Sequence, residues 1–351
     1  MLFGYPVAAT AENWLHDCMV AAIASVHQLI EEQKPLPDWP EVIPLAYRTK
    51  LLSRRGLRDR FVDYAEAVRQ LSTENRKAVL DAVRSQNRIA ELLAGQCECQ
   101  GLGELPASVR EPAKSLFSFA FDLLTDLGIR QRQYQEICNG IPERVCPFCG
   151  CEGLDAPGAP QEDLDHYLPR SKYPFAAANL RNLAPMGGRC NSSYKRTQDP
   201  LRRDDGVRRL ACDPFAASGI AVSFENSVID EVTTGPLVSD WVIDFAPDTE
   251  AVKTWDEIFR IRERWTRDVL DEKTFNKWLG DFQSFCKSSN IPIAEDADVV
   301  DAVKRFQEYL ADCGFEGHAF LKAAAFKLFF RKCEAGSQRL LPIFRALADA
   351  P

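Results

Sequence analysis

The sequence predicts a mainly α fold with a small α+β insert, in which helical N- and C-terminal regions flank a compact module and a short β segment. Two observations predict it. Apolar residues recur at the 3.6-residue spacing of helices toward both ends of the chain, and a stretch rich in Cys, Pro, Gly, Arg and Asn interrupts them after Val145. We expect four segments: 1–140, 141–215, 216–250 and 251–351.

The first segment is predicted to be a helical domain. Helical patterns cover 45–71, 78–93 and 115–127, and turns containing Pro or Gly separate them. Its aromatic residues are predicted to pack in the core. The first apolar stripe passes through Trp14, Met19, Ala22, Ile23, Val26 and Ile30.

Apolar and polar residues alternate between positions 219 and 245, which predicts two or three strands. Helical spacing returns from Lys253 onward. One stripe runs from Trp255 to Trp265, a second from Val299 to Leu310, and a third, heavily apolar one from Phe320 to Phe330. These stripes predict a helical C-terminal domain.

Charge and cysteine content narrow the class of protein. The 43 Lys and Arg are outnumbered by 51 Asp and Glu, a net charge of −8 that argues against a simple basic nucleic-acid binder. No apolar run is long enough for a membrane span, and the N-terminus does not resemble a signal peptide, so we expect a cytoplasmic protein. The 12 cysteines are then expected to be reduced thiols, some of them metal ligands.

Charge is unevenly distributed, however. From His166 to Arg209 there are ten basic residues and three acidic ones. A basic stripe of this kind is what binding to a phosphate backbone requires, although a merely solvated basic face is the alternative.

The first chemical motif is Cys146-Pro-Phe-Cys149-Gly. Two cysteines at this spacing form a tight knuckle whose thiolates can share one zinc ion. A redox pair is the alternative, but no thioredoxin-like βαβ pattern surrounds the motif.

The second motif, Asp165-His166, places a carboxylate beside a side chain that titrates near pH 7. Neighbours in a strand point to opposite faces, so one can face a metal while the other faces an attacking water. The other three histidines are predicted to be structural: His16, His27 and His318.

A third motif, Arg189-Cys190-Asn191-Ser-Ser-Tyr-Lys195, places Asn191 and Lys195 four residues apart, on one side of a short helix. An amide oxygen is an acceptable ligand for Mg²⁺, and a lysine one turn away is suited to a phosphate.

In this order, with Asn182-Leu-Ala-Pro between the second and third motifs, residues 146–195 resemble the HNH endonuclease family, a ββα-metal nuclease module. The resemblance covers about 50 of 351 residues. It implies that His166 is the general base and that Asp165 and Asn191 bind one catalytic Mg²⁺ or Mn²⁺. It implies that Asn182 orients the loop carrying His166. The residues it implies for phosphate contact are Lys195, Arg189, Arg196 and Arg170.

The resemblance also implies a structural zinc site with Cys146, Cys149 and Cys190 as ligands. This chain departs from the family pattern at Gly187, where relatives usually have another cysteine. Structural zinc sites are almost always four-coordinate, so Cys212 or, less favourably, Cys151 is the candidate fourth ligand. A degenerate site without metal is the remaining alternative.

The expected function is metal-dependent hydrolysis of DNA. RNA such as tRNA is the alternative substrate, and a non-catalytic nucleic-acid-binding or assembly protein is the alternative of another class. Long helical flanks around such a module also resemble nucleases of bacterial anti-phage defence systems, some of which act beside an ATPase partner; no membrane partner is expected.

Overall fold

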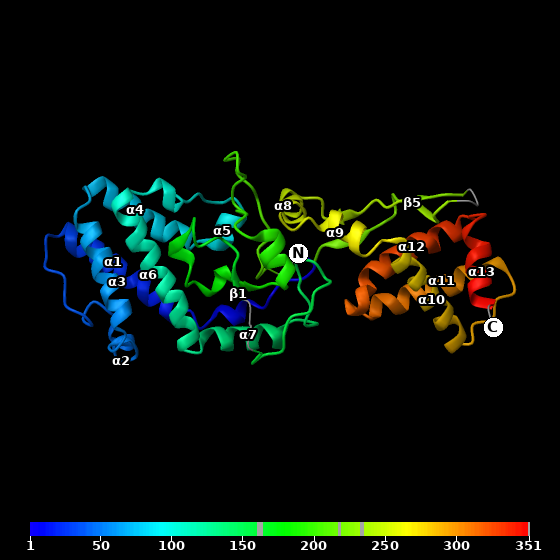
Figure 1. Ribbon diagram of the computed structural model, residues 1–351, viewed down its shortest axis with the longest axis horizontal. Coiled ribbons are helices and arrows are strands. Elements are labelled where there is room, and N and C mark those ends of the chain that lie inside the picture. The colour runs from blue at the N-terminus through cyan, green and yellow to red at the C-terminus, as the bar shows by residue number, and fades with distance from the viewer. Residues whose placement is uncertain (160–163, 217–218, 232–234, 350–351) are drawn as a thin grey trace. The chain divides into compact units, whose positions relative to one another are not determined.

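The protein is mainly α with small antiparallel β pairs, as predicted (Figure 1). The computed structural model describes residues 1–159, 164–216, 219–231 and 235–349. Among these residues, no helix combines the length and apolar character that crossing a membrane requires. The α-helices are α1 (Trp14–Glu31), α2 (Arg48–Leu51), α3 (Arg55–Arg69), α4 (Thr73–Gln86), α5 (Ile89–Leu93), α6 (Ala107–Asp126), α7 (Ile129–Gly140), α8 (Glu250–Phe259), α9 (Ile261–Asp268), α10 (Glu272–Ser288), α11 (Asp296–Asp312), α12 (Ala319–Glu334) and α13 (Leu340–Asp349).

Within the described residues, six short strands form three separate antiparallel pairs: β1 with β2, β3 with β6, and β4 with β5. Among the further short helical segments, η6 is a π-helix. Their bounds are β1 (Leu164–His166), β2 (Leu183–Pro185), η6 (Cys190–Lys195), β3 (Ala221–Ser223), β4 (Val228–Ile229), β5 (Val238–Asp240) and β6 (Asp244–Ala246).

The chain divides into two compact units. The N-terminal unit comprises Phe3–Cys146 and Gly153–Ser218, and the C-terminal unit comprises Met1–Leu2, Pro147–Glu152 and Gly219–Pro351. The helices of 1–140 and most of the motif-bearing segment 141–215 therefore share one unit, and the strands and helices after residue 219 share the other.

In the N-terminal unit, α6 packs against α3, and α1 packs against both α3 and α4 (Figure 1). Most of the predicted stripe of α1 is buried, including Met19, Ile23 and Val26. Ser72 begins α4 by accepting a hydrogen bond from the backbone N–H of Asn75 at 3.3 Å. The helical pattern predicted for 45–71 corresponds to separate helices, because a short non-helical segment lies between α2 and α3.

In the C-terminal unit, α11 packs against α12, and α13 packs against α10 and α11. The apolar face of α12 enters a core of phenylalanine rings, with the Phe306 and Phe326 centroids 4.6 Å apart. The stripe from Trp255 to Trp265 is split between α8 and α9 because Arg260 adopts a left-handed conformation with φ of 49°. Pro147–Glu152, which include the second half of the knuckle, belong to this unit. The indole of Trp255 donates to Phe148 O at 2.9 Å, and that of Trp265 donates to Cys149 O at 3.0 Å.

Two of the histidines predicted to be structural lie in the core of the N-terminal unit. His16 is 3% exposed, and its buried Nδ1 has no hydrogen-bond partner in the part of the chain that the structure describes. His27 is 4% exposed and lies 3.0 Å from the hydroxyl of Tyr64. Burial lowers the pKa of His16 to about 3 and that of His27 to about 4, the second with help from nearby Arg76 and Arg84.

We therefore expect the N-terminal unit to lose stability on acidification. The unfolded chain protonates these histidines near pH 6.5 and the folded chain only near pH 3 to 4, so their contribution is complete above pH 6.5 and falls as the pH drops. Each contributes a slope of about 1.4 kcal/mol per pH unit in that window. When the free energy of unfolding is measured in urea between pH 6 and pH 4, His16→Met should make its dependence on pH shallower by one such contribution. An unchanged slope would contradict the assignment.

Candidate active site

Two of the motifs and part of the Asn182-Leu-Ala-Pro stretch lie on neighbouring elements: Asp165-His166 on β1, Leu183–Pro185 on β2 and Cys190–Lys195 on η6. The two strands pair so that Asp165 faces Ala184 and His166 faces Leu183. Along β1 the side chains alternate: His166 is buried, whereas the Asp165 side chain is 23% exposed. The two motif residues therefore point to opposite faces of the strand, as their adjacency predicts. Two strands followed by a short helix is also the element order that the resemblance implies.

His166 is fixed through one ring nitrogen. Its Nε2 lies 2.9 Å from the carbonyl oxygen of Ala177. Because a carbonyl can only accept, Nε2 carries the hydrogen and Nδ1 keeps the lone pair. Nδ1 hydrogen-bonds to none of the described residues. The imidazole is thus held in the tautomer that can accept a proton at Nδ1.

Burial, with a smaller contribution from the cations Arg170, Lys195 and Arg130, lowers the pKa of His166 to about 3. The hydrogen bond to Ala177 opposes this effect but does not cancel it. His166 is therefore neutral at pH 7, the state that a general base requires. An anionic phosphodiester among the same cations would screen their charge and raise the basicity of the ring.

Asn182 is completely buried and makes three side-chain hydrogen bonds. Its Nδ2 donates to Leu168 O at 3.0 Å and to Ala176 O at 3.2 Å, and its Oδ1 accepts from Leu168 N at 2.7 Å. The carbonyl of Ala176 precedes that of Ala177, which holds His166. Asn182 therefore acts as a positioning residue for the loop around His166, and it does not itself reach solvent.

Lys195 lies deeper than a surface lysine. It is 1% exposed, and its Nζ is 3.4 Å from Asp165 Oδ2. Burial lowers the pKa of Lys195, and the Asp165 carboxylate opposes this shift. Asn191 lies four residues earlier on η6 and is partly exposed; its side-chain amide hydrogen-bonds to none of the described residues. The motif lysine therefore contacts the motif carboxylate, while the amide of Asn191 is available to a ligand.

The basic stretch differs from the predicted stripe. Arg202 and Arg208 both pair with Glu98, at 2.8 and 3.0 Å. Arg181 pairs with Asp213 at 2.5 Å, and Lys172 with Asp199 at 3.4 Å. The predicted basic stripe is therefore partly neutralised: Glu98 and Asp213 from outside the stretch and Asp199 within it pair with four of its basic residues. The exposed cations of the predicted phosphate set are Arg170, Arg189 and Arg196.

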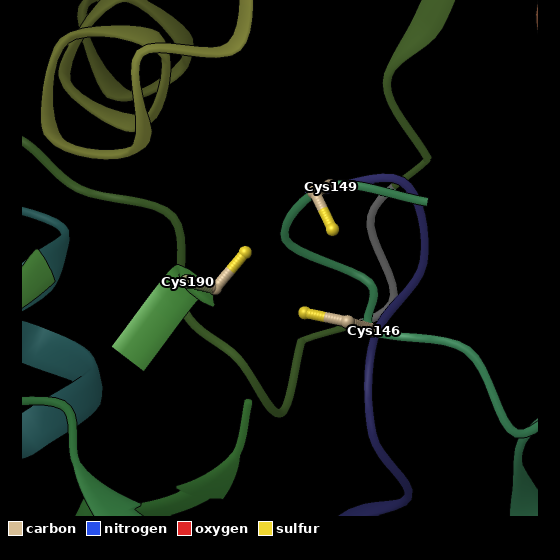
Figure 2. A group of neighbouring side chains, drawn as sticks. All are labelled: Cys146, Cys149 and Cys190. Carbon is tan, nitrogen blue, oxygen red and sulfur yellow. The ribbon is translucent and has the colours of Figure 1, made fainter. Parts of the chain in front are cut away.

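The cysteines of the knuckle and Cys190 form a cluster. The sulfur atoms of Cys146, Cys149 and Cys190 all lie within 4.8 Å of one another and point toward a common centre (Figure 2). All three residues are buried. Thiolates around one tetrahedral zinc ion, with Zn–S bonds of about 2.3 Å, lie roughly 3.8 Å apart. The donor set therefore fits three of the four positions of a structural zinc site.

Neither candidate for the fourth ligand belongs to this cluster. Cys212 lies outside the cluster and close to Tyr167. Burial raises the pKa of Tyr167, and the charge of the Cys212 thiolate adds to this effect. Cys212 immediately precedes Asp213, which the ion pair to Arg181 holds in place. The Cys151 thiol shares a hydrogen bond with that of Cys149, and this contact raises the pKa of Cys151.

The structure adds residues that the sequence analysis missed. Gln86 of α4 is fully buried, and its Oε1 accepts from Phe175 N at 3.0 Å. Gln133 of α7 donates through Nε2 to Leu180 O at 2.8 Å and to Leu183 O at 3.2 Å. These glutamines hold the segment between β1 and β2 against the helices. A glutamine in a helical pattern resembles a surface residue, so no local signal identifies this role.

Comparison of the chain with protein-family models, curated proteins and solved structures finds no match.

Proposed function

We propose that this protein is a metal-dependent endonuclease of the HNH type that hydrolyses phosphodiester bonds, with DNA as the substrate. The observation that carries the proposal is the environment of His166: a neutral imidazole, fixed through Nε2 to Ala177 O, with an acceptor nitrogen left for a proton. Hydrolysis of a phosphodiester needs an activated water and stabilisation of the charge that develops on the phosphate.

In this proposal His166 Nδ1 accepts a proton from a water whose oxygen attacks the phosphorus atom. The bond from phosphorus to the leaving oxygen then breaks, and the leaving oxygen takes up a proton. Asn182 keeps the Ala177 carbonyl in place, so the imidazole retains its orientation during the transfer. Arg170, Arg189 and Arg196 supply exposed positive charge for the phosphate backbone.

Asp165 and Asn191 provide the oxygen donors that Mg²⁺ or Mn²⁺ prefers, one a partly exposed carboxylate and the other an amide without a hydrogen-bond partner among the described residues. A site of one carboxylate, one amide and waters fits Mg²⁺, which usually keeps several waters in proteins. When bound, the ion stabilises negative charge on the phosphate and on the leaving oxygen. Lys195 already balances the charge of Asp165 and would have to share it with the ion.

The direct test is incubation of the purified protein with supercoiled plasmid and with a structured RNA, in Mg²⁺, in Mn²⁺ and without added divalent metal. We expect conversion of the plasmid to nicked circles only with metal. Faster fragmentation of the RNA would favour the alternative substrate. Binding of either nucleic acid without any cleavage would favour the non-catalytic alternative. A role in anti-phage defence beside an ATPase stays a prediction from the resemblance.

The cluster of Cys146, Cys149 and Cys190 is proposed to hold a structural zinc ion. We expect elemental analysis of protein purified without chelator to give about one zinc per chain, and the Cys190→Ser variant to give much less. Cys286→Ser is the matched control, because Cys286 is a buried cysteine of α10 outside the cluster. If the wild-type protein contains no zinc and unfolds at the same temperature as the Cys190→Ser variant, the proposal of a structural zinc site is wrong.

A further inference from the structure

The lysine of the third motif lies beside the residues that are proposed to bind the divalent ion. Lys195 is 1% exposed, and its Nζ lies 3.4 Å from Asp165 Oδ2. Asn191 lies within one π-helical turn of Lys195, because the N–H of Arg196 donates to Asn191 O at 2.8 Å. The ammonium group of Lys195 therefore contacts one proposed oxygen donor and lies one turn away from the other.

A buried ammonium group needs an anion, and Asp165 supplies it. Asp199 is the other acidic residue that acts on Lys195 electrostatically. Its carboxylate is held by other groups, however: Lys172 Nζ lies 3.4 Å from Asp199 Oδ2, and the Tyr173 hydroxyl donates to the same oxygen at 2.8 Å. Asp165 makes no ion pair with any other residue that the structure describes. Asp165 and Lys195 therefore neutralise each other.

The proposed metal site consequently has no negative charge in excess. Asn191 is neutral, the charge of Asp165 is balanced by Lys195, and Arg170 adds a positive charge near His166. A divalent ion gains much of its affinity from the negative charge of its ligands, and a neighbouring cation repels it. A phosphodiester would bring the negative charge that the protein itself does not supply.

We propose that Lys195 is the internal counter-ion of the metal site, which keeps Asp165 neutralised in the free protein, so that Mg²⁺ or Mn²⁺ binds firmly only together with a nucleic-acid phosphate. This inference rests on the proposed function for the identity of the site. It gives Lys195 a role that differs from the direct phosphate contact implied by the resemblance. By linkage, metal and nucleic acid then raise each other's affinity by the same factor.

The first test measures Mn²⁺ binding to the protein without nucleic acid, from the electron paramagnetic resonance signal of the free ion. Lys195→Met removes the charge and keeps an unbranched side chain in the buried position. We expect its dissociation constant for Mn²⁺ to be lower than that of wild type by about tenfold or more, because the repulsion by one unit charge is removed. Lys195→Gln, which keeps a polar end, should show the same change if the methionine variant does not fold.

Lys172→Met is the matched control. It also removes a lysine whose Nζ lies 3.4 Å from a carboxylate oxygen, but that carboxylate belongs to Asp199. The control should bind Mn²⁺ as wild type does. The double variant Asp165→Asn/Lys195→Met should lose the gain in affinity, which assigns the gain to this site. Equal Mn²⁺ affinities of the two lysine variants, or a gain that survives Asp165→Asn, would overturn the inference.

The second test measures the coupling to nucleic acid. A short fluorescein-labelled DNA duplex is titrated with the His166→Gln variant, with and without Mn²⁺, and binding is followed by anisotropy. We expect Mn²⁺ to tighten binding by about tenfold, and not to tighten it once Asp165→Asn is added, because an ion that only screens the DNA acts on both proteins alike. Equal effects of Mn²⁺ on the two proteins, or no binding of the duplex, would contradict the coupling.

These outcomes are separable from that of the nuclease proposal. Tighter Mn²⁺ binding by Lys195→Met, combined with a wild-type protein that cleaves nothing, would keep the role of Lys195 and reject the nuclease. Metal-dependent cleavage by wild type, combined with equal Mn²⁺ affinities of the two lysine variants, would keep the nuclease and reject the counter-ion.

Discussion

Replacing His166 by alanine is expected to lower the rate of metal-dependent plasmid nicking by a factor of about 10² to 10⁴, the usual contribution of a positioned general base. The reason is that the Nδ1 lone pair accepts the proton of the attacking water, and we assign this role to no other described side chain. The rate constant for loss of supercoiled plasmid, measured at saturating Mn²⁺ and pH 7.5, provides the comparison.

His166 is also buried, so alanine removes packing against Phe121 as well as a base. His166→Gln separates the two effects. Glutamine can donate a hydrogen bond toward Ala177 O and keeps much of the side-chain volume, but its amide cannot accept a proton at neutral pH. We expect His166→Gln to lose as much activity as the alanine variant and to unfold closer to wild type. Activity within threefold of wild type in either variant would exclude His166 as the base.

Replacing Asn182 by alanine should be among the most destabilising changes in the N-terminal unit. Three hydrogen bonds disappear from a fully buried position, and Leu168 N, Leu168 O and Ala176 O lose their side-chain partner. A buried polar group left unpaired costs about 1–3 kcal/mol, so the total loss is roughly 3–6 kcal/mol. That is a large fraction of the stability of an ordinary domain.

Urea unfolding followed by circular dichroism measures this loss, and Asn226→Ala is the control. Asn226 is an exposed asparagine whose Nδ2 donates to Asp244 at 2.8 Å, so its removal should cost less than about 0.5 kcal/mol. Asn182→Ala should also reduce nicking, because the loop that carries the Ala177 carbonyl is freed. Equal stability of the two variants would contradict the role given to Asn182.

The helical regions and the order of the motif elements could be predicted from the sequence because they depend on local spacing. The stripes near Trp14 and Phe320 become α1 and α12, and the helical turn from Cys190 to Lys195 follows the two strands. Breaks inside a stripe were harder to predict. The split at Arg260 requires a left-handed backbone at a residue that does not favour it, and nothing in the apolar pattern indicates such a residue.

The contacts of the site could not be predicted, because they join distant segments. Lys195 was expected to face a phosphate, but the fold buries it against Asp165, thirty residues away. Arg202 and Arg208 were counted as available charge, but Glu98 pairs with both. Motif spacing describes one module. It carries no information on the acidic and aromatic residues that neighbouring helices bring to it.

The proposal that His166 and Asp165 form one hydrolytic site is tested by comparing three proteins in one plasmid-nicking assay. Wild type, His166→Gln and Asp165→Asn are incubated with supercoiled DNA over a range of Mn²⁺ concentrations. We expect nicked circles with wild type alone at low Mn²⁺, and none with His166→Gln at any concentration. Nicking by His166→Gln at the wild-type rate, or no metal-dependent nicking by wild type on either DNA or RNA, would contradict it.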